Sequence, residues 1–178
     1  RPCGRWFSPQ PMNRHNGEIT VEIAKSSAMA LERLEQNGYE AYVVGGCVRD
    51  SLMGVAPHDW DICTSALPEQ TRRVFAGYPV IDTGLKHGTI TVLVDGAPLE
   101  ITTFRTDGDY QDNRRPSSVT FVPNIQEDLA RLDFTINAMA YSPARGLIDC
   151  FDGEADLRAG VLRSVGNPEQ RFKEDGLR

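Results

Sequence analysis

The sequence lacks long hydrophobic runs and cysteine motifs. No apolar stretch approaches the ~20 residues that cross a membrane, and no charged leader followed by an apolar core opens the chain. We therefore expect neither a transmembrane helix nor a secretory signal, and by default a cytoplasmic location. None of the four cysteines lies two to four residues from another, the spacing typical of structural zinc sites, so Cys3, Cys47, Cys63 and Cys150 are expected to be reduced thiols.

The chain also lacks an excess of basic residues. Its 19 Lys and Arg stand against 25 Asp and Glu, a net charge of −6, which argues against a protein that binds nucleic acid over its whole surface. Its 16 Gly and 11 Pro follow no repeat, which excludes collagen-like and low-complexity classes. The 178 residues, 40% of them hydrophobic, suit one compact domain or one domain plus a fragment.

The pattern of apolar and turn-forming residues predicts a mixed α and β chain after an unpatterned segment, 1–17, which we interpret as a leader or an added remnant. Helices are expected at 18–37, 47–53, 68–76, 134–141 and, open-ended, 168–178. Strands are expected at 39–44, 58–63, 87–94, 99–104, 119–122 and 147–151. The segment 105–118 is polar and is expected to be a mobile loop.

Asp59 and Asp61 flank Trp60 in a predicted strand. Because side chains alternate along a strand, both carboxylates are expected on one face, where their repulsion favours a bound cation. Hard oxygen ligands of this kind suit Mg²⁺, which completes its shell with phosphates and water. Two solvated aspartates at a polar strand edge are the alternative, because this short motif is common.

The pair Gly45-Gly46 lies between a predicted strand and a predicted helix. Such a turn lets a phosphate approach the backbone and the helix N-terminus, and Arg49, one turn later, is placed to reach the same anion. A simple turn is the alternative. The glycines do not form the G-x-G-x-x-G pattern of a redox Rossmann domain. Together with Asp59 and Asp61, on an expected adjacent strand, they indicate a nucleoside-triphosphate site.

Glu100 lies in a strand among Leu99, Ile101 and Thr103, and alternation places it on the opposite face from them. It is a candidate third carboxylate of this cluster, and an ordinary solvent-facing glutamate is the alternative.

Two further groups of charged and polar residues are candidates for contact with the edge of a base. Arg131, Asp133 and Asn137 surround the start of the predicted helix 134–141. The last turn of the sequence holds Glu174, Asp175 and Arg178. A carboxylate and a guanidinium on a rigid helix supply acceptors and donors for the edge of a base, whereas the alternative is a surface ion pair.

Four motifs in order closely resemble the class II tRNA nucleotidyltransferase and bacterial poly(A) polymerase family. They are Gly45-Gly46-Cys47-Val48-Arg49-Asp50, Asp59-x-Asp61, the run from Arg131 to Met139, and Glu174-Asp175-x-x-Arg178. The segments 103–108 and 114–116 resemble the mobile loop of the CCA-adding branch.

This resemblance implies an α+β fold with a polymerase-β-type nucleotidyltransferase head, a mixed sheet flanked by helices, at 18–163. Residues 164–178 would begin a helical neck. It implies a template-independent enzyme that adds CCA from CTP and ATP to the 3′ end of tRNA by two-metal phosphoryl transfer, with pyrophosphate release. Asp59 and Asp61 would bind Mg²⁺ and, with Glu100, form the catalytic set.

The resemblance also implies roles in nucleotide binding. Gly45, Gly46 and Arg49 would hold the triphosphate, and Arg131, Asp133 and Asn137 would contact its sugar or phosphates. Asp175 and Arg178, supported by Glu174, would select the base.

One departure from the family pattern is Leu132, which stands where a second arginine is usual. A-adding, CC-adding and poly(A)-adding activities remain alternatives within the class, and a non-catalytic nucleotide- or RNA-binding fragment is an alternative outside it. Because tRNA contacts in this family come mostly from later helical domains, we expect these 178 residues alone to bind nucleotide weakly and to extend tRNA poorly.

Overall fold

The computed structural model describes residues 14–15, 18–82, 84–108, 118–169 and 171. Its helices are α1 (Lys25–Gln36), α2 (Gly46–Leu52), α3 (Pro68–Val74), α4 (Ile125–Ala130) and α5 (Gly153–Ala159), with 3-10 turns η1 (Leu85–His87) and η2 (Thr135–Asn137). Its strands are β1 (Arg14–His15), β2 (Glu18–Ile19), β3 (Ala41–Val44), β4 (Asp61–Thr64), β5 (Val80–Ile81), β6 (Thr89–Val94), β7 (Ala97–Thr103), β8 (Arg105–Asp107), β9 (Val119–Phe121), β10 (Met139–Ser142) and β11 (Gly146–Asp149).

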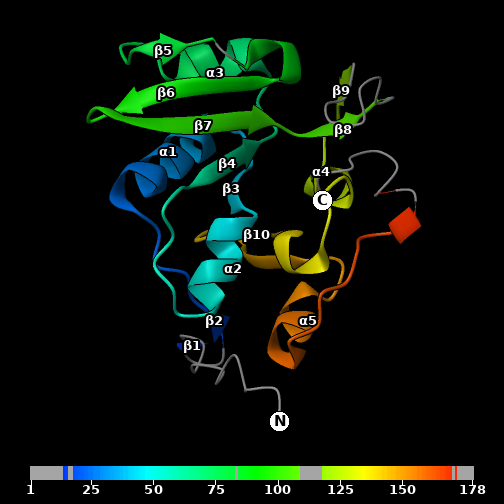
Figure 1. Ribbon diagram of the computed structural model, residues 1–178. Helices are drawn as coiled ribbons and strands as arrows, with labels where there is room; N and C mark the ends of the chain where they lie inside the picture. The colour runs from blue at the N-terminus through cyan, green and yellow to red at the C-terminus, as the bar shows by residue number, and fades with distance from the viewer. Residues whose placement is uncertain (1–13, 16–17, 83, 109–117, 170, 172–178) are drawn as a thin grey trace.

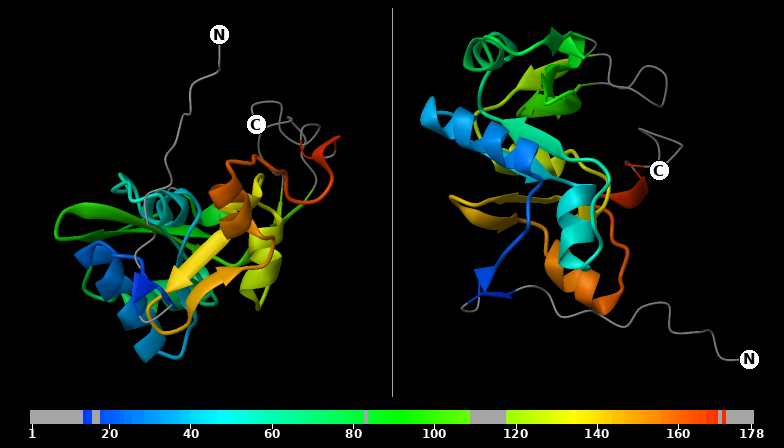
Figure 2. Two further views of the ribbon diagram at one scale, coloured as in Figure 1. Left: turned by 90° about the horizontal axis from the view of Figure 1, so that it is seen from below. Right: turned by 90° about the vertical axis from the view of Figure 1, so that its left-hand side faces the viewer.

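The main sheet has seven strands in the order β11-β10-β3-β4-β7-β6-β5. Strands β4 and β7 run parallel, and the other neighbouring pairs run antiparallel, so the sheet is mixed. Figures 1 and 2 show β5 to β7 at one end of the sheet and β10 and β11 at the other, with α2 and α5 near the β10 end. The strands β8 and β9 form a separate antiparallel ribbon.

Alternating side chains give the sheet two apolar faces. One face, which includes Val43 and Ile62, packs in the larger core with Leu31 and Leu34 of α1. The opposite face packs in a smaller core, formed by Tyr42, Cys63, Phe104, Ile125, Leu129 and Ala140. Helix α4 therefore covers the face of β4 on which Cys63 lies. Asp61, two residues earlier in β4, has the same parity as Cys63 and belongs to this face.

The strand–glycine–helix unit and the hairpin are confirmed. Strand β3 ends at Val44, and α2 begins at Gly46. Strands β6 and β7 are joined at Asp95 and Gly96, which both adopt positive φ angles, 52° and 80°, as tight hairpin turns require.

Two expected helices differ from the structure. The helix expected at 18–37 begins only at Lys25, because Glu18–Ile19 pairs instead with β1, and the β-branched residues after it favour extended backbone. The helix expected at 134–141 is wrong. Its residues form the short turn η2 and then β10, which hydrogen-bonds to β3 and β11. A short apolar run does not distinguish a buried strand from a helix, and here sheet pairing decides.

The strand and loop boundaries also shift. The strand expected at 58–63 starts at Asp61, so Asp59 precedes it. The segment 105–118 is not loop throughout, because Arg105–Asp107 pairs with Val119–Phe121. Helices α4, of six residues, and α5, of seven, were not expected from the sequence. Among the described residues, no helix combines the length and apolar character needed to traverse a bilayer.

Candidate active site at the start of β4

Asp61 is the first residue of β4, and its two neighbouring strands place the other candidates around it. Its partner in β3 is Val44, the residue directly before Gly45, and its partner in β7 is Glu100. Cross-strand partners project from the same face of a sheet, so the Asp61 and Glu100 carboxylates lie side by side. Both residues are partly open to solvent. The sheet thus brings together two of the candidate carboxylates and the glycine turn.

The three candidate carboxylates interact electrostatically. Burial raises the pKa of Asp61 above its ordinary value, and the charges of Glu100 and Asp59 raise it further, while Arg131 acts in the opposite direction. A carboxylate whose pKa is raised by two neighbouring carboxylates lies in a region of net negative potential. Such a region attracts cations.

The sequence predicted that Asp59 and Asp61 share a face because both belong to one strand, but only Asp61 lies in β4. Asp59 lies in the irregular segment before β4, so strand alternation does not fix its direction. Its effect on the pKa of Asp61 shows that the two carboxylates are nevertheless close. Within the described part of the chain, no three His, Cys, Asp or Glu side chains are grouped closely enough to hold a metal ion by themselves.

The glycine turn is closely connected to Arg49 and Asn137. Gly45 adopts φ 83° and ψ −134°, a conformation that favours glycine, and its N–H donates to the Met139 carbonyl at 3.0 Å. The Arg49 guanidinium donates to Asn137 Oδ1 at 2.6 Å and forms an ion pair with Asp50 at 2.7 Å. A Cβ added at Gly46 would lie 3.5 Å from Arg49 Nη2, so the guanidinium passes directly beside this glycine.

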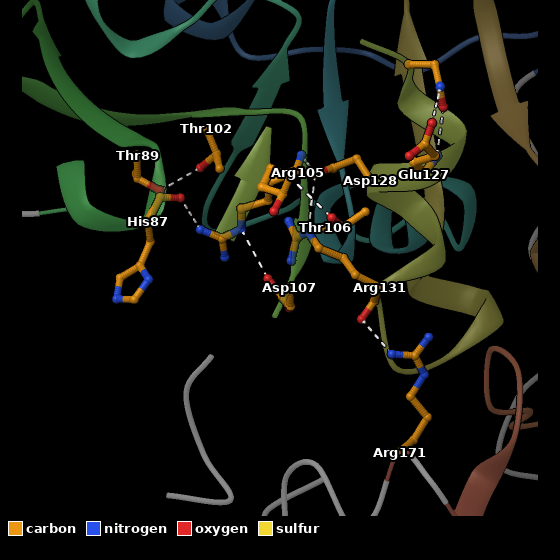
Figure 3. Close-up of polar contacts among 12 residues, drawn as sticks. His87, Thr89, Thr102, Arg105, Thr106, Asp107, Glu127, Asp128, Arg131 and Arg171 are labelled. Carbon is orange, nitrogen blue, oxygen red and sulfur yellow. Dashed lines mark hydrogen bonds and ion pairs between the residues drawn. The ribbon is translucent and has the colours of Figure 1, made fainter. Parts of the chain in front are cut away.

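Arg131 lies on the α4 side of the sheet, in a network of charged residues shown in Figure 3. It follows α4, and its Nε forms an ion pair with Asp128 Oδ1 at 3.2 Å. Burial opposes its charge, but Asp128 and Asp107 more than offset this and raise the pKa of Arg131. Its guanidinium therefore stays charged, and that charge acts on Asp61.

The segment that follows Arg131 differs from the expected helix start. Leu132, at the position of a usual arginine, packs against the smaller core. Asp133 is half-buried, and its carbonyl accepts the Val165 N–H at 2.9 Å. Asn137 ends η2 and is the member of this set that reaches the glycine turn, through Arg49.

Glu174, Asp175 and Arg178 lie outside the described residues, as do residues 114–116 of the expected loop. The final described residue, Arg171, is hydrogen-bonded to main-chain carbonyls both near it and far from it in sequence. Its guanidinium donates to the carbonyls of Val165 at 3.0 Å, Arg131 at 3.4 Å and Ala130 at 2.5 Å.

Two cysteines are close to the candidate site in sequence: Cys47 follows Gly46, and Cys63 comes two residues after Asp61. Both are buried and free. Burial raises the pKa of Cys47 to about 11 and that of Cys63 well above its ordinary value. Both stay neutral at physiological pH, so neither has the thiolate that a nucleophile or a metal ligand requires.

Sequence reasoning missed Asp128 and Arg171. Asp128 stands three residues before Arg131, the spacing of an ion pair on one helix face, and this signal was available. Arg171 binds main-chain carbonyls 40 and 41 residues away, which no local pattern indicates.

The mixed sheet with its flanking helices matches solved structures of nucleotidyltransferases. The family model of the poly A polymerase head domain matches residues 41–163, and the chain belongs to this family.

Two curated relatives are both named CCA-adding enzyme. A CCA-adding enzyme of Lactobacillus delbrueckii subsp. bulgaricus is 54% identical over 158 residues, which are 89% of this chain and 39% of that protein. A CCA-adding enzyme of Lactobacillus helveticus is 55% identical over 148 residues, 83% of this chain and 37% of that protein. The chain thus spans about two fifths of the length of these relatives.

Solved structures agree with the fold. The CCA-adding enzyme of Bacillus stearothermophilus in complex with CTP matches with a TM-score of 0.76 and 45% identity, over 86% of this chain and 36% of that one. A tRNA nucleotidyltransferase complexed with a primer tRNA and an incoming ATP analog matches with a TM-score of 0.64 and 30% identity, over 84% of this chain and 42% of that one.

Proposed function

We propose that the chain is the head of a template-independent nucleotidyltransferase that adds CCA to the 3′ end of tRNA from CTP and ATP. Family membership and relatives named CCA-adding enzymes support this proposal. The structural observation that carries it is the cross-strand pairing of Asp61 with both Val44 and Glu100, which places carboxylates next to the Gly45-Gly46 turn.

In this proposal the triphosphate lies along the glycine turn. Gly45 and Gly46 leave the backbone open to the phosphates, and the Arg49 guanidinium, held beside Gly46 by Asn137, donates to them. Arg131 supplies a second positive charge on the side of Asp61.

The remaining nucleotide contacts complete the proposed site. Asp133 and Asn137 would contact the sugar or the phosphates. Asp175 and Arg178, supported by Glu174, would pair with the base edge and so select CTP or ATP.

We propose that residues 18–163 form the head, after the segment 1–17, and that 164–178 begin a helical neck. Most tRNA contacts would come from later helical domains.

The donor set fits Mg²⁺. Asp59 and Asp61 offer hard oxygen ligands in a region of negative potential, and Mg²⁺ takes one or two carboxylates together with substrate phosphates. Asp59 and Asp61 would hold the metal, and Glu100 would lie beside them. When bound, Mg²⁺ supplies Lewis acidity and neutralises charge on the triphosphate.

The reaction is an in-line displacement at phosphorus. The 3′-hydroxyl of the RNA attacks the α-phosphorus and gives its proton to solvent, a new P–O bond forms, and the bond from the α-phosphorus to the oxygen that bridges to the β-phosphate breaks to release pyrophosphate. The contribution of this chain is to fix the triphosphate between the glycine turn and the carboxylates, so that the α-phosphorus faces the hydroxyl.

A nucleotide-incorporation assay tests the function. The chain is incubated with Mg²⁺ and a tRNA that lacks its terminal CCA, with labelled CTP and ATP separately and together. We expect weak incorporation of C from CTP alone, CCA ends on a small fraction of the tRNA with both nucleotides, and a matching release of pyrophosphate. Asp59→Ala and Asp61→Ala should abolish both signals. Nucleotide binding that survives these substitutions, without pyrophosphate release in any sample, would instead identify a non-catalytic nucleotide sensor.

A further inference from the structure

Asp128 is a buried carboxylate at the end of α4 that has no part in the proposed site. Its side chain has 0% exposure. Its Oδ1 accepts the Arg105 N–H at 2.9 Å and contacts Arg131 Nε at 3.2 Å. Its Oδ2 is buried and makes no hydrogen bond to any described residue. A buried carboxylate requires compensation, and the Arg131 guanidinium provides the opposite charge.

Asp128 connects Arg131 to strand β8, near the site. The main chain of Arg105 is the start of β8, which leaves the main sheet directly after β7, the strand of Glu100. Within β8, Arg105 Nε faces Asp107 Oδ1 at 3.5 Å, and Asp107 also acts on Arg131. Figure 3 shows Asp107 between the side chains of Arg105 and Arg131.

The ion pair with Asp128 is the direct side-chain contact that the structure gives Arg131, while Asp107 adds a second negative charge nearby. Arg131 lies beyond the last residue of α4, so the helix backbone does not fix its side chain. The contact with Asp128 Oδ1 is made by Nε. Helix α4 packs on the face of β4 that holds Cys63 and Asp61, so the Arg131 charge at its end lies on the same side of the sheet as Asp61 and acts on it.

We propose that Asp128 is a positioning residue, which fixes the Arg131 guanidinium toward Asp61 and the nucleotide by an ion pair that also anchors the start of β8. This inference rests on the proposed function, because it assigns how one of its nucleotide contacts is held. Asp128 itself touches no nucleotide and acts through Arg131.

A double-mutant cycle on CTP binding tests this proposal. The variants are Asp128→Asn, Arg131→Met and the double variant, each in the whole 178-residue chain with Mg²⁺ present. Asparagine keeps an acceptor for the Arg105 N–H but removes the charge. Trp60, between Asp59 and Asp61, reports binding by its fluorescence in a Trp6→Phe background.

We expect Asp128→Asn to weaken CTP binding about tenfold when Arg131 is present, and to have no further effect in the Arg131→Met background. Asp156 provides the matched control, because it is the buried carboxylate that pairs with Arg163 at 3.0 Å. Whatever its own effect, Asp156→Asn should combine additively with Arg131→Met.

The outcomes separate the two proposals. If the unsubstituted chain binds no CTP, the proposed function fails and this inference fails with it. If it binds CTP and the effects of Asp128→Asn and Arg131→Met are additive, the positioning role alone is overturned.

Where Asp128→Asn does not fold, Arg131→Lys serves as the second test. Lysine keeps the charge but has no planar fork to be oriented by Asp128. Weakened CTP binding supports the proposal, and unchanged binding overturns it.

Discussion

Asp61 on β4 and Glu100 on β7 are direct partners in a parallel strand pair, so two carboxylates project side by side from the same face. The next strand on the other side of Asp61 ends at Val44, immediately before Gly45. The three neighbouring strands β3, β4 and β7, in the middle of the sheet, thus bring these residues together, and the negative charge of the site is a consequence of strand register. Repulsion between these carboxylates is expected to lower the stability of the metal-free fold.

Asp61→Asn is expected to stabilise the metal-free fold and to abolish activity. Because the pKa of Asp61 is raised in the folded state, the folded chain holds this proton more tightly than the unfolded chain does. The ionised carboxyl therefore destabilises the fold at neutral pH, and this effect disappears as the pH falls through the folded pKa toward the unfolded value.

Thermal unfolding in EDTA, at neutral pH and at about pH 3, measures this effect. Asp61→Asn should unfold at a higher temperature than the unsubstituted chain at neutral pH, and the difference should vanish in acid. A lower unfolding temperature at neutral pH would show that Asp61 is not repelled by its neighbours.

Gly45→Ala is expected to impair both folding and nucleotide binding. Gly45 has φ 83°, and an L side chain there adds strain of about 1–3 kcal/mol. Gly96, at φ 80° in the β6–β7 turn with open space around it, is the matched control. Denaturant unfolding should show comparable losses for Gly45→Ala and Gly96→Ala. Only Gly45→Ala should weaken CTP binding, and equal binding by both variants would argue against a phosphate at this turn.

Arg49→Met is expected to weaken CTP binding about tenfold or more, the effect of losing one charge-assisted hydrogen bond. Arg145→Met is the control, because Arg145 pairs with Glu35 and lies over Tyr42, near the β10–β11 turn. Titration with CTP should show unchanged affinity for the control. If Arg49→Met binds CTP as tightly as Arg145→Met, the guanidinium has only its structural contacts with Asn137 and Asp50.

Arg171→Met is expected to destabilise the fold by about 1.5–3 kcal/mol, because a charged donor to main-chain carbonyls after α4 is lost. Arg158, in a surface ion pair with Glu154 on α5, is the control and should lose at most about 0.5 kcal/mol. Urea unfolding compares the two. Equal losses of unfolding free energy in the two variants would show that the hydrogen bonds of Arg171 with the end of α4 do not stabilise the fold.

The candidate residues that carry short-range signals were found from the sequence. Gly45-Gly46 between a strand and a helix has a local pattern, and so has the alternation around Glu100. The pairing of Asp61 with Glu100 depends on a parallel crossover, which local patterns do not specify. The proximity of the two strands was an inference from chemistry and resemblance.

Tertiary context explains the errors. Met139, Ala140 and Tyr141 form a short apolar run, and hydrogen bonds with β3 and β11 make it a strand. Asp128 is hidden in a short helix, capped by Asn124 accepting the Glu127 N–H at 3.0 Å, that has too few residues for a periodic signal. Arg171 was missed because its partners are far away in sequence.

The most direct test of the account is whether Asp59 and Asp61 bind a divalent ion together with nucleotide. Mn²⁺ replaces Mg²⁺ in an electron paramagnetic resonance titration of the chain, with and without CTP. Because two carboxylates leave most of the coordination shell to phosphate and water, we predict weak Mn²⁺ binding alone and tighter binding with CTP. In the double variant Asp59→Ala, Asp61→Ala, CTP should no longer increase the amount of Mn²⁺ bound to the chain. The Mn²⁺–CTP complex in buffer without protein gives the reference signal. Undiminished binding by this double variant would contradict the account.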